Sequence, residues 1–172
     1  MVSSGITSLL LPGGQTAHSK FKIHVSTFDD SICNIHQGSE LAELLKVTKL
    51  IIWDEAPMAH KFCFQALDKS LKDIMELGNE SSTIFGGKVI VFGGDFRQIL
   101  LVIPRGSRSN IVHSTINASY IWDRCEVLIL TKKTCVCNLV WTTYLQVKLV
   151  AFPNGYLILE MENFLNQMMV ML

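Results

Sequence analysis

The sequence predicts an α/β fold with a mostly parallel sheet, and three observations lead to this prediction. Two short apolar runs, 50–53 and 89–92, read as strands buried on both faces. Between them, from 62 to 77, apolar residues recur at helical spacing. A strand, a helix and a second strand in this order favour parallel pairing. The residues that follow both strands then lie at one edge of the sheet, where open α/β sheets bind ligands.

Before the first of these strands, the sequence predicts two helices joined by an irregular connector. A short apolar helix over Gly5–Leu11 is stopped by Pro12. The connector spans Ser26–Gln37. A second helix over Ser39–Leu45 has Ser39 as its N-cap, and its expected buried residues are Leu41, Leu44 and Leu45.

After the first strand, Pro57 fits the first turn of the next helix, where its missing N–H is not needed. His60 is expected at the surface or as a helix cap. The helix that follows has Phe62, Ala66, Leu67, Leu71, Ile74 and Met75 as its expected core positions. Further along, a helix is predicted over Ser109–Tyr120 and a buried strand over Glu126–Leu130.

The first apolar run stops at two adjacent carboxylates, Asp54 and Glu55. One carboxylate can hold Mg²⁺, a hard cation that prefers oxygen ligands and keeps several waters. The other can orient or deprotonate an attacking water. This is the arrangement of the acidic strand motif of nucleoside triphosphatases. A strand that ends in a solvated acidic turn would look the same, so this stretch alone leaves both interpretations open.

The second apolar run leads into Gly93 and Gly94, and then into Asp95, Arg97 and Gln98. Glycines allow a close approach of two backbones or a positive φ. If the two strands are neighbours, these polar residues lie at the same edge as the two carboxylates.

Three motifs in this order resemble the Pif (petite integration frequency) type of ATP-dependent DNA helicase, most closely its plant and Helitron-linked members. They are Leu11–Ile23, Asp54-Glu55-Ala56-Pro57-Met58 and Gly93–Leu100. The resemblance extends from about Ser3 to Lys132. It implies a three-layer RecA-like (P-loop NTPase) domain, truncated at its N-terminus, with ATP as substrate and Mg²⁺ as cofactor.

The resemblance also implies a role for each site residue near the nucleotide. Asp54 would hold Mg²⁺, and Glu55 would activate the attacking water. Gln98 would sense the γ-phosphate and link hydrolysis to DNA, while Asp95 and Arg97 would support the nucleotide-binding loop.

The upstream motif resembles a segment that contacts a DNA strand. Thr16 and His18 offer donors to phosphate oxygens, and Lys20 adds positive charge. Phe21 could stack on a base or pack in the core. The alternative is a polar loop with Phe21 buried. The implied partners are single-stranded DNA or duplex junctions.

Two features depart from the family pattern. No G-x-x-x-x-G-K-[ST] phosphate loop occurs in the 172 residues, although such a loop cradles the phosphates and supplies a neutralising lysine. Cys135 stands where the family carries an arginine that stabilises the transferring phosphoryl group, and a thiol cannot replace a guanidinium. We therefore expect residues 1–134 to form a partial RecA-like domain without that loop, and 135–172 to form an unrelated tail.

These observations leave three functional readings open. The first is a fragment of a helicase that couples ATP hydrolysis to DNA unwinding. Family resemblance links such enzymes to DNA repair, recombination and telomere maintenance, in the nucleus or alternatively the mitochondrion. The second is a non-catalytic remnant that binds DNA or protein. The third is a non-functional product of a truncated gene.

Composition limits the possible partners. Lysine plus arginine equals aspartate plus glutamate at 15 each, so DNA binding must depend on a local patch rather than on net charge. The odd number of cysteines, five, argues against a disulfide scaffold and favours reduced thiols. The apolar stretch Leu139–Leu159 is interrupted by polar residues, so no membrane span is expected.

Overall fold

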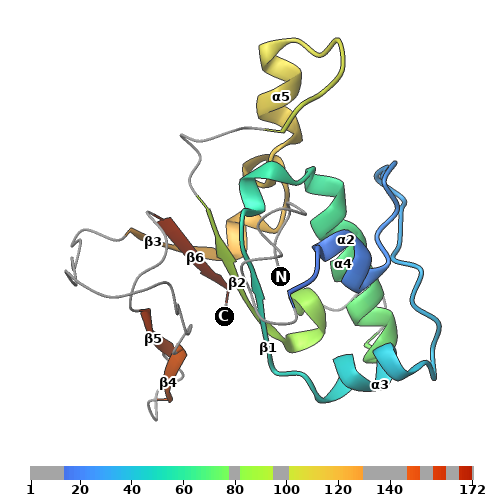
Figure 1. The fold of residues 1–172 in the computed structure, drawn as a ribbon, viewed down its shortest axis with the longest axis vertical. Coiled ribbons are helices and arrows are strands. Elements are labelled where there is room, and N and C mark those ends of the chain that lie inside the picture. The colour runs from blue at the N-terminus through green and yellow to red at the C-terminus, as the bar shows by residue number, and fades with distance from the viewer. Residues whose placement is uncertain are drawn as a thin grey trace.

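The computed structural model describes residues 14–77, 82–94, 101–129, 147–151, 157–161 and 167–171. The helix predicted over Gly5–Leu11 lies outside these ranges. Four described strands form one sheet in the order β1-β2-β6-β3 (Figure 1). Their bounds are Leu50–Trp53 for β1, Val89–Gly93 for β2, Gln167–Met171 for β6 and Cys125–Ile129 for β3.

The two strands that carry the motifs are parallel neighbours, as predicted. In register, Leu50 of β1 pairs with Val89 of β2, and Trp53 pairs with Phe92. Strand β6 runs antiparallel to both β2 and β3, so β1, β2 and β3 all point the same way. The predicted α/β class is confirmed. A separate antiparallel pair joins β4 (Val147–Ala151) to β5 (Leu157–Met161).

Helix α3 (Glu40–Val47) begins where the sequence predicts. The Ser39 Oγ accepts a hydrogen bond from the Ala42 N–H at 3.2 Å, which satisfies one donor of the first turn. Ala42 and Leu45 are buried, three positions apart on one face. Leu44 falls outside this face and is 48% exposed, so its prediction as a buried residue was wrong.

Helix α4 (Lys61–Ile74) is the longest described helix and covers the sheet. The His60 Nδ1 accepts from the Phe62 N–H at 3.2 Å, which confirms the expectation of a capping histidine. Pro57 lies in the short 3₁₀ helix η1 (Ala56–Met58), which precedes α4. Of the predicted core positions on this segment, Phe62 and Met75 are only partly buried, while Ala66, Leu67, Leu71 and Ile74 are buried.

The core centres on the face of the sheet that α4 covers. The Trp53 ring centroid lies 4.7 Å from that of Phe64 on α4 and 6.3 Å from that of Phe92 on β2. The Phe64 and Phe92 rings meet edge to face at 5.2 Å. Ile51 and Ile90 extend the same buried cluster, because residues two apart on a strand share a face.

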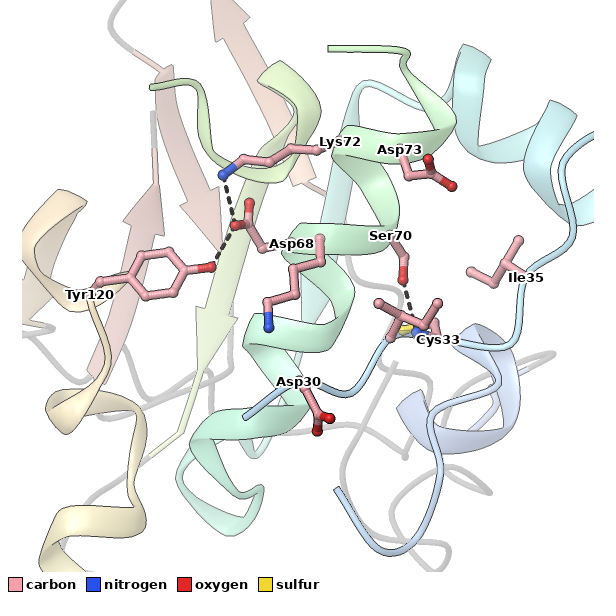
Figure 2. A pocket seen from close by; sticks show the side chains of 10 residues that line it. Asp30, Cys33, Ile35, Asp68, Ser70, Lys72, Asp73 and Tyr120 are labelled. Atoms are coloured by element: carbon pink, nitrogen blue, oxygen red, sulfur yellow. Dashed lines mark hydrogen bonds and ion pairs between the residues drawn. The ribbon is translucent and has the colours of Figure 1, made fainter. Parts of the chain in front are cut away.

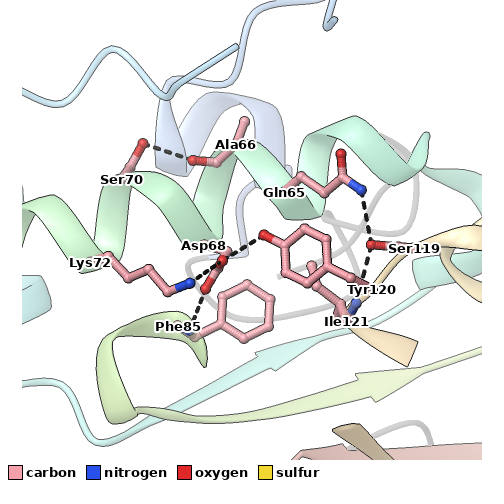
Figure 3. A network of polar contacts seen from close by, with 9 residues as sticks. All are labelled: Gln65, Ala66, Asp68, Ser70, Lys72, Phe85, Ser119, Tyr120 and Ile121. Carbon is pink, nitrogen blue, oxygen red and sulfur yellow. Dashed lines mark hydrogen bonds and ion pairs between the residues drawn. The ribbon is translucent and has the colours of Figure 1, made fainter. Parts of the chain in front are cut away.

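A buried carboxylate ties α4 to two later segments (Figure 3). Asp68 Oδ1 accepts from the Phe85 N–H of η2 (Ile84–Gly87) at 2.5 Å. Asp68 Oδ2 accepts from the Tyr120 hydroxyl at 2.6 Å and pairs with Lys72 Nζ at 3.0 Å. Since Asp68 is fully buried, these three partners replace the water that an ionised carboxylate would otherwise need.

The region after residue 101 is more broken than predicted. Helix α5 (Arg108–Ser114) ends early because Thr115 adopts extended backbone (φ −78, ψ 164) and its Oγ1 donates to the Val112 carbonyl at 2.8 Å. The prediction of one helix over Ser109–Tyr120 was therefore wrong. Two short 3₁₀ helices follow, η3 (Ile116–Ala118) and η4 (Trp122–Arg124). Strand β3 forms as predicted, although Val127 is 45% exposed rather than buried.

Removing the Asp68 carboxylate tests how much this network stabilises the domain. We expect Asp68→Ala to lower the free energy of unfolding by about 3 kcal/mol, because it leaves Lys72, the Tyr120 hydroxyl and the Phe85 N–H without their partner. Asp73→Ala, on the exposed face of the same helix, is the control and should change stability by less than about 0.5 kcal/mol. Urea unfolding of both variants measures the difference, and equal stabilities would contradict the assignment.

Candidate functional site

The turn after β1 places two carboxylates at the carboxyl end of the strand. Asp54 follows Trp53 directly, and its Oδ1 accepts from the Glu55 N–H at 2.8 Å. Glu55 lies in the left-handed region (φ 57, ψ 37), a conformation that non-glycine residues rarely adopt. This conformation turns the chain from β1 into η1. Burial raises the pKa of Asp54 above its usual 3.8, while the Glu55 N–H acts in the opposite direction.

The end of β2 packs directly against the same turn. Gly94 has a φ of +149, and a Cβ built there would lie 2.3 Å from Pro57 Cδ. Real side chains never approach so closely, so this contact requires glycine. Since Trp53 and Phe92 are register partners, Asp54 and Gly93 follow them on adjacent strands. The strands therefore deliver Asp54, Glu55 and Gly93-Gly94 to one rim, as expected.

The other predicted members of this rim fall outside the described residues. They are Asp95, Arg97 and Gln98. Their roles remain predictions. The last described residue before them is Gly94, in contact with Pro57.

The predicted DNA-contact segment is a short helix, α2 (Ala17–Phe21), rather than a loop. The Thr16 Oγ1 caps it by accepting from the Ser19 N–H at 3.2 Å, and a hydroxyl that accepts can still donate its own hydrogen. Phe21 is buried, with its ring centroid 6.1 Å from that of Trp53. Of the two readings for Phe21, core packing is therefore correct and base stacking is wrong.

His18 anchors α2 to the first turn of α4. Its Nε2 lies 3.6 Å from the Cys63 Sγ, and that sulfur lies 3.7 Å from the Thr27 Oγ1. Burial lowers the pKa of His18 and raises the pKa of the Cys63 thiol, so both side chains favour their neutral forms. With Phe21 against Trp53, these contacts bring α2 next to the strand that carries Asp54.

Sequence reasoning missed the contacts that hold this site together. The Gly94–Pro57 contact and the His18–Cys63–Thr27 cluster join residues far apart in the chain, and no local pattern reports them. The only sequence signal for these contacts was the Gly93-Gly94 pair after a strand. It indicated that another segment approaches the backbone there, but not which segment.

Neither of two cavities in the described parts of the chain includes a predicted site residue. One, of 690 Å³, lies between α4 and the connector and is lined by Asp30, Asp68, Lys69, Lys72 and Tyr120 among others (Figure 2). The other, of 420 Å³, lies at the start of β2. The described residues also contain no group of three or more His, Cys, Asp or Glu side chains able to hold a metal ion, and no helix among them could cross a membrane.

Comparison with known proteins identifies clear relatives. A family model described as PIF1-like helicase matches residues 1–163. The crystal structure of Bacteroides Pif1 bound to ssDNA is 26% identical with a TM-score of 0.57, and the match covers 72% of this chain and 29% of that one. No curated protein sequence matches.

Two further solved structures support the same likeness. Bacteroides Pif1 in complex with ADP-AlF3 and ssDNA is 25% identical with a TM-score of 0.57, covering 72% of this chain and 29% of that one. A structure concerning DNA unwinding at forked dsDNA by two coordinating Pif1 helicases is 27% identical with a TM-score of 0.52, covering 70% and 27%. This chain thus spans less than a third of the length of the helicases it matches.

A methyl group at Gly94 tests the contact between β2 and the turn after β1. We expect Gly94→Ala to lower the free energy of unfolding by at least about 2 kcal/mol, because its Cβ overlaps Pro57. Gly38→Ala is the matched control: its φ is +77 but nothing lies within 4 Å of its Cβ position, so only backbone strain of about 1 kcal/mol applies. Urea unfolding compares the two, and an equal loss would mean that β2 does not approach Pro57.

Two partly buried histidines, His18 and His60, predict a pH dependence of stability. Burial lowers the pKa values of His18 and His60 from 6.5, so the unfolded chain binds these protons more tightly than the folded protein. Stability is therefore fully present above pH 6.5 and declines as pH falls below it. Urea unfolding at about pH 7.5 and about pH 5.5 measures this slope. The double variant His18→Gln/His60→Asn should flatten it, and an unchanged slope in this variant would contradict the assignment.

Proposed function

Because this chain belongs to the PIF1-like helicase family, we propose that it forms part of the first motor domain of an ATP-dependent DNA helicase. The observation that carries the proposal is the parallel register of β1 and β2. This register brings Asp54 and Glu55 to the edge of the sheet where Gly94 packs on Pro57. Helix α2, which includes His18 and is capped by Thr16, lies beside this edge. A nucleotide site and a DNA site on one rim are what a motor needs to couple hydrolysis to movement along a strand.

The donor set at this rim fits Mg²⁺. That ion uses one or two protein carboxylates and completes its shell with waters and nucleotide phosphates, so the lack of a larger ligand cluster among the described residues is compatible with it. Asp54 would hold the ion, which would neutralise charge on the phosphates. Glu55, the next carboxylate, would orient the attacking water and accept its proton.

The remaining nucleotide roles follow from family resemblance. Gln98 would contact the γ-phosphate, and Asp95 and Arg97 would support that loop. The substrate would be ATP, in keeping with the matched Pif1 structure that holds ADP-AlF3.

The DNA partner would be single-stranded DNA or a junction with duplex, in keeping with the ssDNA and forked dsDNA named for the matched helicases. Thr16 can donate a hydroxyl hydrogen to a phosphate, His18 lies beside it, and Lys20 supplies charge from the same helix. The processes that this activity would serve are DNA repair, recombination and telomere maintenance, in the nucleus or alternatively the mitochondrion.

A specific observation supports a second function, that of a non-catalytic DNA-binding module. By family resemblance, Cys135 stands where relatives carry an arginine, and that arginine acts on the phosphates rather than on DNA. DNA-stimulated ATP hydrolysis by this chain tests the second function. We expect negligible turnover by the chain alone, and turnover comparable to that of whole family members would contradict the second function.

A lysine substitution tests the DNA-binding role of α2. We expect Lys20→Gln to weaken binding of single-stranded DNA several-fold and to reduce the slope of log affinity against log salt by about 1, because one phosphate contact is lost. Fluorescence anisotropy at two salt concentrations measures both quantities.

Lys46→Gln is the matched control for this experiment. Lys46 lies in the last turn of α3, which leads into the opposite end of β1 from Asp54, and it pairs with Glu43 at 2.9 Å. Its substitution should leave both affinity and salt slope unchanged. Equal effects of the two substitutions would show that binding is diffuse and does not involve α2 specifically.

A further inference from the structure

The connector between α2 and α3 exposes a large aromatic side chain. Phe28 is 66% exposed, and Val25 nearby is 93% exposed. Phe21, only seven positions earlier, is 1% exposed and fully used by the core. The Phe28 side chain therefore takes no part in the hydrophobic core, although burial of a ring of this size is normally strongly stabilising.

The turn that carries Phe28 is held firmly. The Phe28 N–H donates to the Ser31 Oγ at 2.7 Å, and the Ser31 N–H donates back to the Phe28 carbonyl at 3.1 Å. Lys69 Nζ donates to the Asp29 carbonyl, and Thr27 contacts Cys63. Since Cys63 and Lys69 both belong to α4, the turn is fixed to that helix on either side of Phe28. An exposed ring on an anchored turn is presented to solvent at little entropic cost of ordering.

The same anchors place this turn beside the proposed DNA-contact helix. Cys63 touches Thr27 on one side and His18 of α2 on the other, at 3.7 and 3.6 Å. In Figure 1, the blue stretch after α2 extends toward the end of the domain where β1 and β2 finish. Phe28 directly follows Thr27, and both Thr27 and His18 contact Cys63.

Charge near the turn is divided between its two sides. Lys22 and His24 are exposed in the stretch that joins α2 to the turn. On the other side, Asp30 lines the 690 Å³ cavity together with Lys69 and Lys72 of α4 (Figure 2). Lys22 is thus the one lysine between α2 and Phe28, and two exposed acidic residues, Asp29 and Asp30, follow the ring.

We propose that Phe28 is a stacking platform for one base of a single strand whose phosphates run along α2. The proposal rests on the proposed DNA-binding function and adds a base contact to it. Phe28 offers only an apolar ring face, and every nucleobase has a matching π-face. An exposed aromatic close to lysine side chains, here Lys20 and Lys22, is an arrangement by which proteins hold single strands without reading their sequence. An apolar protein partner is the competing occupant, and the experiment below tests it.

The test uses the full 172-residue chain and a fluorescent oligothymidylate of about 15 nucleotides. We expect Phe28→Ala to raise the dissociation constant about tenfold and Phe28→Tyr to restore it, since tyrosine keeps the ring face. Val25→Ala, at an apolar residue between α2 and the turn that is more exposed still, is the control and should not change affinity. An abasic oligonucleotide of the same length should bind the wild type and Phe28→Ala equally, because it has no base to stack.

Two outcomes would overturn the stacking role, and a third would refute the DNA-binding function on which it rests. Unchanged oligothymidylate affinity in Phe28→Ala would leave an apolar protein partner as the occupant of this surface. An equal loss on the abasic strand would assign Phe28 to folding or phosphate contact, and urea unfolding of the variant would separate these two. A wild-type chain that binds neither strand would refute the proposed DNA-binding function itself. If Lys20→Gln lowers the affinity for the oligothymidylate and Phe28→Ala does not, only the stacking role is refuted.

Discussion

The structure depends on the burial of one indole ring. Trp53 is fully buried at the end of β1, and aromatic side chains from three other elements surround it: Phe21 of α2, Phe64 of α4 and Phe92 of β2. Tilted aromatic pairs of this kind contribute about 0.5–1.5 kcal/mol each beyond the area they bury. Strand β1 and two of these three elements, α2 and β2, also carry or lead into part of the proposed site. The residue after Trp53 is Asp54, Gly93 follows Phe92, and Thr16 and His18 precede Phe21. Core packing and site geometry are therefore set by the same contacts.

Helix α4 connects this core to the rest of the domain. Its first turn holds α2 and the connector through Cys63, and its middle holds η2 and the segment around Tyr120 through Asp68. Under the proposed function, a nucleic acid would be held by a local group of side chains, because the chain has no net charge. The stretch from Thr16 to Phe28 would supply this group, and contacts of His18, Thr27 and Asp29 with α4 hold the stretch in place.

The sequence predicted the parts of this architecture that have a local cause. The strands were found from their unbroken apolar runs, and α3 was found because Ser39 can cap it. The expectation that β1 is buried on both faces was wrong, because Leu50 and Ile52 are only partly buried. Helix α2 was missed because five residues are too few to show a helical period. The early end of α5 depends on a hydroxyl hydrogen bond at Thr115. The antiparallel insertion of β6 between β2 and β3 joins segments about 75 and 40 residues apart, and no local pattern encodes such pairing.

Within the candidate site, the sequence proposed the residues but not the contacts that bring the described ones together. The family motifs named Asp54, Glu55, Thr16 and His18, and the order of elements predicted one rim. The contact of Gly94 with Pro57 could not be predicted, because a glycine signals freedom of the backbone and not the group that approaches it.

The most direct test of this account is a nuclear Overhauser measurement on the full chain. The account predicts strong cross-peaks between the Gly94 Hα and Pro57 Hδ protons, together with cross-peaks between the Trp53 and Phe92 rings. Their presence would place the ends of β1 and β2 at one rim. Ring contacts without the Gly94–Pro57 cross-peaks, or a pairing of β1 with β2 in another register, would contradict it.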